Sequence, residues 1–351
     1  MRALTLPSAL VLITLTACGG GSSGGSSTPV AANPITSPVT TTPATPVSTA
    51  QAAILQDAVA PTYVAGSTAD IAFKKINAFR AAQGLGPLNQ NANADIAAKN
   101  HQAYVALNNS GANGHVEVAG TPGFTGATVK DRLVAAGYPA TIAGEVIAFS
   151  LEYPNPDTSA VDNLINTVYH RASMMYQGFT AVGVAGEDAT NPLYMDFGAT
   201  KAQLNAGDYV GVYPANGQTA VWLTHSVESP NPFYQEMDMT QANMCTKTSA
   251  PVSLTSEAST TLSVTSFTVT EAGQTTPLDV RLITSATSTQ DTTYLGTNVA
   301  FVVGKAPFKA NTTYNVHFVG KATGAATGSA NGLSIDKLWS FTTGSYKRGC
   351  P

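Results

Sequence analysis

Apolar residues recur at the spacing of helices in the first part of this chain and at the spacing of strands in the second part. This change restricts the order in which helical and sheet layers can follow one another. Between about residues 68 and 175, apolar side chains recur at the spacing of amphipathic helices. Two apolar runs at 179–187 and 192–200 then have the length of strands, and from about residue 251 apolar and polar residues alternate. Helices come first and strands follow. The sequence therefore predicts an α+β domain with helices on a mostly antiparallel sheet, followed by an all-β sandwich.

Start and stop signals mark the helices of the first domain. Ser67 or Thr68 can cap a helix that Gly84 ends. A second helix is predicted over residues 92–109, a third ends at Gly137, and a fourth covers 158–175. His101 lies within the second helix, where packing beside a cleft is its expected role.

The first 55 residues cannot contribute to a hydrophobic core. Arg2 precedes an apolar run of about a dozen residues, which is typical of an export signal and too short to span a bilayer. The sequence "LTAC" at Leu15–Cys18 resembles a bacterial lipobox, which implies cleavage before Cys18 and a lipid on its thiol. An ordinary signal peptide is the alternative. Residues 19–55 are a Gly/Ser/Thr/Pro-rich tether, so an exported lipoprotein of the outer membrane or cell surface is expected.

Charge and cysteine content exclude some functions. The net charge is −4 without a basic run, which excludes an electrostatic site for nucleic acid. After Cys18, only Cys245 and Cys350 remain, and in an oxidising compartment two thiols pair most simply with each other. A catalytic thiol is the alternative, although neither cysteine lies in a recognisable motif.

An ordered set of short segments carries a family resemblance. The segments are "INAFR", "AAKNHQAY", "GHVE", "DRLVAAGY", "GEVIAFS", "YHR" and "VGVAG", within about residues 68–200. This order resembles the CAP superfamily of cysteine-rich secretory proteins, antigen 5 and pathogenesis-related 1, in its bacterial SCP-like extracellular branch. The resemblance implies an α-β-α sandwich with a shallow cleft lined by two His and two Glu, which hold a divalent metal in some members.

The resemblance places the cleft residues on particular positions. His115 of "GHVE", Glu145 of "GEVI" and His170 of "YHR" match the family pattern. The family's second Glu has no match in "NLINTVYHR", and Glu117 is the proposed substitute. His115 and His170 with these carboxylates are a suitable donor set for zinc. A metal-free hydrogen-bonded cluster is the alternative reading of the same four residues.

The second half contains no comparable set of chemical groups. Runs such as Val299, Phe301 and Val303 predict strands, and the last hairpin resembles bacterial immunoglobulin-like modules. His225 is interpreted as a surface or internally satisfied residue, and His317 as facing solvent. The predicted organisation is an export signal with lipobox, a tether, a CAP domain, a connector and an immunoglobulin-like sandwich, over residues 1–18, 19–55, 56–205, 206–245 and 246–351.

Two functions remain open on this sequence. The first is a lipid-anchored, non-catalytic binding module whose cleft takes a lipid, a glycan or a protein, with no required cofactor. The second is a metal-dependent or acid/base hydrolase of a peptide or cell-wall substrate, for which His115, Glu145 and His170 are the catalytic candidates. The absence of a nucleophile motif and of the second family Glu favours the first.

Overall fold

The computed structural model describes residues 59–108, 114–148, 160–186, 192–346 and 350. The predicted export signal, Cys18 and the predicted tether lie outside these residues. By contacts the chain divides into 1–47 and 48–351, and the described residues all belong to the second unit. Among them, no helix combines the length and the apolar content needed to cross a membrane.

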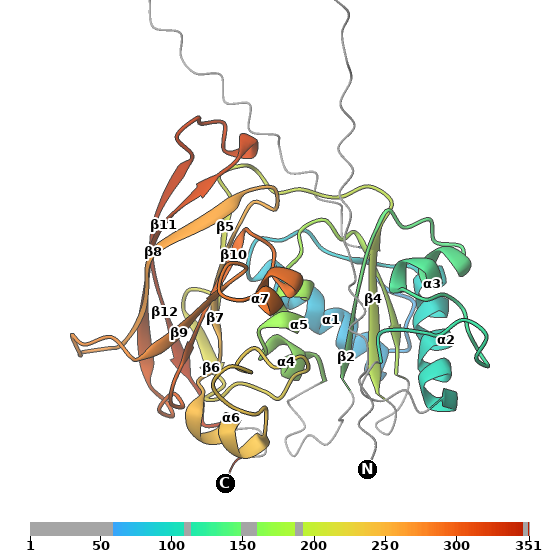
Figure 1. Ribbon diagram of the computed structural model, residues 1–351, viewed down its shortest axis with the longest axis horizontal. Helices are drawn as coiled ribbons and strands as arrows, with labels where there is room; N and C mark the ends of the chain where they lie inside the picture. Colours follow the sequence, from blue (N-terminus) through green and yellow to red (C-terminus); the bar gives the residue numbers. More distant parts are fainter. Residues whose placement is uncertain (1–58, 109–113, 149–159, 187–191, 347–349, 351) are drawn as a thin grey trace, which may run out of the picture. The chain divides into compact units, whose positions relative to one another are not determined.

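The first domain contains a four-stranded sheet and the helices around it (Figure 1). Its strand order is β1-β3-β4-β2; β1 pairs with β3 in parallel, and the other pairs are antiparallel. Its elements are α1 (Thr68–Ala81), β1 (Asn89–Gln90), α2 (Ala92–Asn108), α3 (Val129–Ala135), β2 (Ile142–Ala148), α4 (Ala160–Ile165), α5 (Tyr169–Met174), β3 (Ala181–Ala185) and β4 (Leu193–Ala199).

Helices cover both faces of this sheet. On one face, α2 and α3 pack on Ala181, Ala185 and Tyr194 (Figure 1). On the other, α1, α4 and α5 pack on alternate residues of the same strands, such as Val182 and Val184. The predicted α-β-α arrangement is confirmed.

Local sequence explains two features of this packing. The Ser67 side chain accepts a hydrogen bond from the amide of Asp70, so it is the cap of α1. A β-carbon at Gly183 would lie only 2.0 Å from the carbonyl carbon of Ala94. Glycine at this position therefore allows α2 to lie directly on β3.

The second domain is a sandwich of two four-stranded sheets, of order β5-β7-β10-β9 and β6-β12-β11-β8. Inner side chains of both sheets form one cluster that includes Leu254, Val302, Phe318 and Phe341. A β-sandwich after the first domain is thus confirmed. Its elements are β5 (Val210–Tyr213), β6 (Gln218–Val221), α6 (Gln241–Lys247), β7 (Val252–Ser256), β8 (Thr261–Glu271), β9 (Val280–Thr284), α7 (Thr289–Tyr294), β10 (Val299–Gly304), β11 (Thr313–Thr323), η2 (Ala325–Thr327) and β12 (Leu333–Thr343).

Strand β10 is buried on both faces. Ala300 and Val302 face the sandwich core, whereas Val299, Phe301 and Val303 belong to the cluster that contains α1, α4 and α5. The run Val299, Phe301 and Val303 was expected to fill the sandwich, and it fills the core shared with the first domain instead. The alternation placed these three residues on the wrong side of the sheet, because a helical layer covers the face on which they lie.

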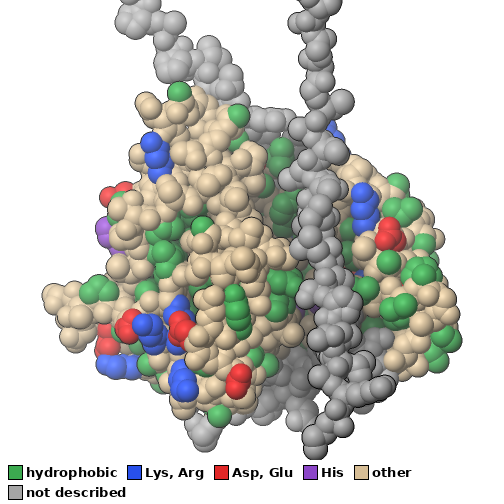
Figure 2. Space-filling model, in the orientation of Figure 1, with side chains coloured by type: hydrophobic (Ala, Val, Ile, Leu, Met, Phe, Trp, Pro, Cys, Tyr) green, Lys and Arg blue, Asp and Glu red, His purple; other side chains and the backbone are tan. Residues whose placement is uncertain are grey.

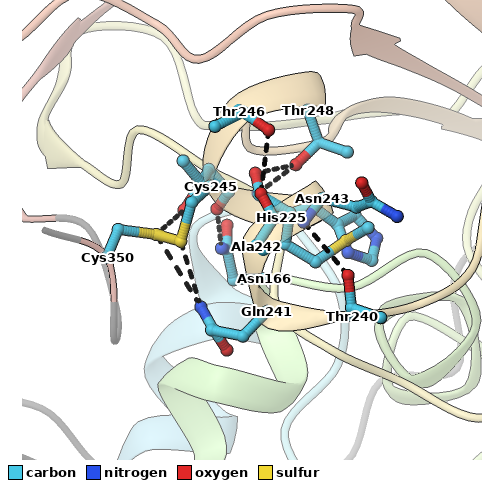
Figure 3. The surroundings of a disulfide bond; sticks show 12 residues. Asn166, His225, Thr240, Gln241, Ala242, Asn243, Cys245, Thr246, Thr248 and Cys350 are labelled. Carbon is cyan, nitrogen blue, oxygen red and sulfur yellow. Dashed lines mark hydrogen bonds between the residues drawn. A yellow bond between two sulfur atoms is a disulfide. The ribbon is translucent and has the colours of Figure 1, made fainter.

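Residues 206–245, expected as a connector, carry two edge strands. β5 pairs with β7 in one sheet, and β6 pairs with β12 in the other. At the end of this segment Cys245 forms a disulfide with Cys350, with a Cα–Cα distance of 5.5 Å, beside the amide of Gln241 (Figure 3). The bond spans 105 residues and by the chain-entropy model contributes about 4–5 kcal/mol.

The shared core predicts cooperative unfolding of both domains. We expect Phe301→Ala to reduce the free energy of unfolding by about 3–5 kcal/mol, because a fully buried ring is removed. Both tryptophans pack in the sandwich, so their fluorescence reports that domain, and helical circular dichroism reports mainly the first. The two signals should change together in urea. Two separate transitions would contradict the shared core, and Leu338→Ala, at a 70 % exposed position, is the control.

Candidate functional site

The first polar cluster forms where α2 meets the loop after it. Glu117 is buried; its carboxylate accepts hydrogen bonds from the amides of Thr125 at 2.5 Å and Gly126 at 3.1 Å. His101 Nδ1 lies 2.9 Å from Glu117 Oε1, and Nε2 contacts the carbonyl of Gly114. Both partners of the imidazole are acceptors, so His101 satisfies both bonds only with a proton on each nitrogen.

Glu145 on β2 joins this cluster to the surface. Arg132 of α3 donates from Nη2 to Glu145 Oε2 at 2.8 Å, and His115 Nδ1 lies 2.7 Å from Glu145 Oε1. The side chain of Glu145 is 2 % exposed, whereas that of His115 is 47 % exposed. Bonding through Nδ1 leaves Nε2 of His115 to solvent. His115 is therefore the exposed end of a buried chain of charges.

Two opposed carboxyl groups have separated pKa values. Glu145 lies directly opposite Asp196 in the β2–β4 pairing. Burial alone would raise the pKa of Glu145, but the charge of Arg132 and the bond from His115 outweigh it and lower the pKa. Burial, and then the charge of Glu145, raise the pKa of Asp196 well above its usual value. The environment thus shifts the pKa values of these two facing carboxyl groups in opposite directions.

This cluster does not fit a metal ion. His101 Nδ1 already lies 2.9 Å from Glu117 and Arg132 Nη2 lies 2.8 Å from Glu145, so a divalent cation would have to displace both groups from these carboxylates. Within the described ranges, no three His, Cys, Asp or Glu side chains are placed to share an ion. His115 and His170 were the expected zinc ligands, and the structure pairs each with a different glutamate.

A second polar cluster holds His170. Glu228 is buried, and its carboxylate accepts from the amides of Val168 at 2.8 Å and Tyr169 at 3.0 Å, at the start of α5. His170 Nδ1 lies 3.2 Å from Glu228 Oε2, and His225 Nε2 lies 3.2 Å from Oε1. Burial alone would raise the pKa of Glu228, but the bonds and charges of the two histidines lower it to about 2. The carboxylate of Glu228, which follows β6 in the sequence, therefore binds His170.

Sequence reasoning found part of this arrangement. The structure brings His115, Glu117 and Glu145 into one cluster and places His170 in another. It adds His101 and Asp196 to the first cluster. Glu228 and His225 complete the second, although no linear pattern links them to His170, 58 residues before Glu228. The one available signal is "HSVE", which places His225 and Glu228 three positions apart in a segment of low charge.

Part of this chain is similar to known proteins. The family model described as CAP, cysteine-rich secretory protein family, matches residues 73–197. The chain carries a CAP domain. A solved structure of an extracellular protein containing a SCP domain from Bacillus anthracis is similar, at 22 % identity and a TM-score of 0.31, over 38 % of this chain and 40 % of that one. No curated protein matches.

The residues that match the CAP family contain the first cluster completely and the second cluster only in part. The first cluster lies wholly within residues 73–197, whereas His225 and Glu228 of the second lie outside. Further contacts cross the same limit: Arg171 Nη1 donates to the carbonyl of Pro251 at 2.7 Å, and Tyr169 Oη donates to Asp291 Oδ1 at 2.7 Å. Residues after the CAP domain thus hold the helix that bears His170.

The low pKa of Glu228 predicts a pH dependence of stability. A folded pKa of about 2, below an unfolded value near 4.5, stabilises the chain above pH 4.5, and this contribution disappears as the pH falls toward 2. We expect Glu228→Gln to cost about 3 kcal/mol at pH 7 and to flatten the decline of stability between pH 4.5 and 3. Urea unfolding across this range measures both effects.

The matched control is Glu236→Gln, because the Glu236 carboxylate lies on the same segment and is 49 % exposed in its pair with Arg281. This substitution should change the stability little and leave its pH dependence as in the parent. Identical pH profiles for the parent and Glu228→Gln would contradict the assigned role of Glu228.

Proposed function

We propose that this chain is an exported, lipid-anchored protein whose CAP domain is a non-catalytic binding module. His115 provides the exposed polar contact for a lipid, glycan or protein ligand, without a required metal. The anchor is a lipid on Cys18, and the outer membrane or the cell surface is the proposed location. The sequence of residues 1–18 supports this address.

One observation carries the binding role. The buried ionisable groups of the first cluster bind one another, and only His115 reaches the surface. In the described part of the chain, no Ser, Thr or Cys side chain hydrogen-bonds the ring of His115, so the imidazole has no nucleophile to activate. A group held in one orientation by Glu145 and open at Nε2 is suited to receive a hydrogen bond from a ligand.

A second function has its own supporting observation. The 2.7 Å bond between His115 and Glu145 is also the geometry of a general base backed by a carboxylate. An acid/base hydrolase acting through a bound water would use this pair. The two functions differ in whether a bound molecule is changed.

We expect ligands to perturb His115 without turnover. The chain is titrated with soluble peptidoglycan fragments and with phospholipid vesicles while the ¹⁵N signals of His115 are followed by NMR. His115→Ala should weaken any binding about tenfold, as for the loss of one good hydrogen bond. His317→Ala is the control, since His317 is exposed on β11 and bonded only to Asp336. Mass spectrometry of the same samples should find no product.

Product that disappears in both His115→Ala and Glu145→Gln would decide for the hydrolase. Binding that is equal in the parent and in His115→Ala would remove His115 from the site.

The anchor is tested separately. We expect cells fed labelled palmitate to incorporate the label into the parent chain and not into Cys18→Ser, because the thiol at position 18 accepts the lipid. Cys245→Ser is the control, since Cys245 is engaged with Cys350 and should leave labelling intact. Equal labelling of the parent and Cys18→Ser would refute the anchor.

A further inference from the structure

Four exposed apolar side chains lie on the end of α2 and on the loop that carries His115. Leu107 ends α2, and Val116, Val118 and Phe124 lie on the following loop, with exposed fractions of 64 %, 39 %, 60 % and 39 %. We call these four residues the apolar rim. Figure 2 shows hydrophobic side chains at the surface of the lobe that carries α2 and α3. Large apolar side chains that are exposed together are typical of a surface that binds a protein, a membrane or a ligand.

The loop is fixed against the end of α2, which keeps the rim together. The amide of Val118 donates to Tyr104 Oη at 2.9 Å, and Asn108 Nδ2 donates to the carbonyl of Pro122 at 2.9 Å. Gly123 packs on the side chain of Leu107. The loop residues and Leu107 therefore lie on one surface.

Buried Glu117 orients the rim outward. Its buried carboxylate holds the amides of Thr125 and Gly126, while the residues on either side of it, Val116 and Val118, are exposed. The rim does not have to reorganise before it binds, which saves the entropy of ordering a loop.

The sequence around the apolar rim contains few charged residues. Between residues 101 and 128, Glu117 is the one Asp, Glu, Lys or Arg in the sequence, and it is buried. Contact of this stretch with hydrocarbon therefore desolvates no fixed charge of its own. The first carboxylate after it is that of Asp131, an exposed residue of α3 that lies close to Gly126.

We propose that the apolar rim docks on the phospholipid bilayer that holds the lipid of Cys18. This step rests on the anchor of the proposed function. The amide of Val59 bonds to Asn89 Oδ1, just before α2 begins, and the rim lies at the other end of this 17-residue helix, about 25 Å away. The 40 residues from 19 to 58 could span at most about 140 Å if they were fully extended. The tether is long enough for anchor and rim to reach one membrane.

Anchoring makes a weak docking surface sufficient. A tether of this length holds the rim near the bilayer at a high effective concentration, so a few apolar side chains can keep the CAP domain on the surface. In that orientation His115, between Gly114 and Val116, faces the headgroups. The anchored chain would thus present its exposed imidazole to molecules in or on the membrane.

Vesicle flotation of the unacylated chain tests the rim alone. The chain carrying Cys18→Ser is mixed with vesicles of phosphatidylethanolamine and phosphatidylglycerol at 3:1. We expect it to float, and Val118→Asp with Phe124→Asp to reduce its partition at least about tenfold. Leu338→Asp is the matched control, because Leu338 is 70 % exposed on β12 and should leave flotation unchanged. Circular dichroism verifies that each variant is folded.

Insertion of the apolar rim into the bilayer is measured separately from flotation. Phe124→Trp keeps an apolar ring at the rim, and its fluorescence, measured against the parent, should shift to the blue with vesicles. Equal flotation of the parent and the double Asp variant would overturn the proposal, as would a parent that does not float. A parent that light scattering finds dimeric, with a monomeric double variant, would assign the rim to a second copy instead. Palmitate labelling tests the anchor and the His115 titration tests the binding site. Their results do not depend on the outcome of flotation.

Discussion

The burial of β10 on both faces is the constraint on which the rest of this structure depends. A strand whose alternate residues lie in two cores cannot move without opening both. Ala300 and Val302 belong to the sandwich, and Phe301 belongs to the helices of the CAP domain. Polar contacts across the same interface, such as Arg171 with Pro251, are placed by this packing. The order of layers follows: helices, sheet, helices, and then the two sheets of the sandwich.

The buried charges of each cluster pair mainly with one another. Arg132 and His115 lower the pKa of Glu145, whereas burial, and then the charge of Glu145, raise the pKa of the opposed Asp196. Glu228 has a comparable role at α5, where backbone amides and two imidazoles bind one carboxylate. Groups that resemble a catalytic set in sequence are mostly occupied in holding loops and helix ends. His115 stands apart because it alone in the first cluster is exposed.

The sequence predicted the layers well and the partners of side chains less well. Helical period and caps located α1, and Ser67 is its cap. In α2 the apolar residue Ile96 is 47 % exposed, because small alanines occupy the contact with β3. Motif order located His115, Glu145 and His170. It could not locate Glu228, since a contact between residues 58 apart depends on where the connecting segment returns. Burial of β10 on both faces was equally hidden, because alternation along a strand does not reveal whether a second layer covers the outer face.

Glu228 has a consequence for how such a protein can change during evolution. Its carboxylate comes from the segment after the CAP match, yet it occupies the amides at the start of α5. A recombination event that moved residues 73–197 alone to another chain would leave those amides and His170 without their acceptor, in the protein interior. Exchange of the CAP segment alone would therefore reduce the stability of the recipient chain, whereas a substitution in the exposed loop around His115 leaves these contacts intact.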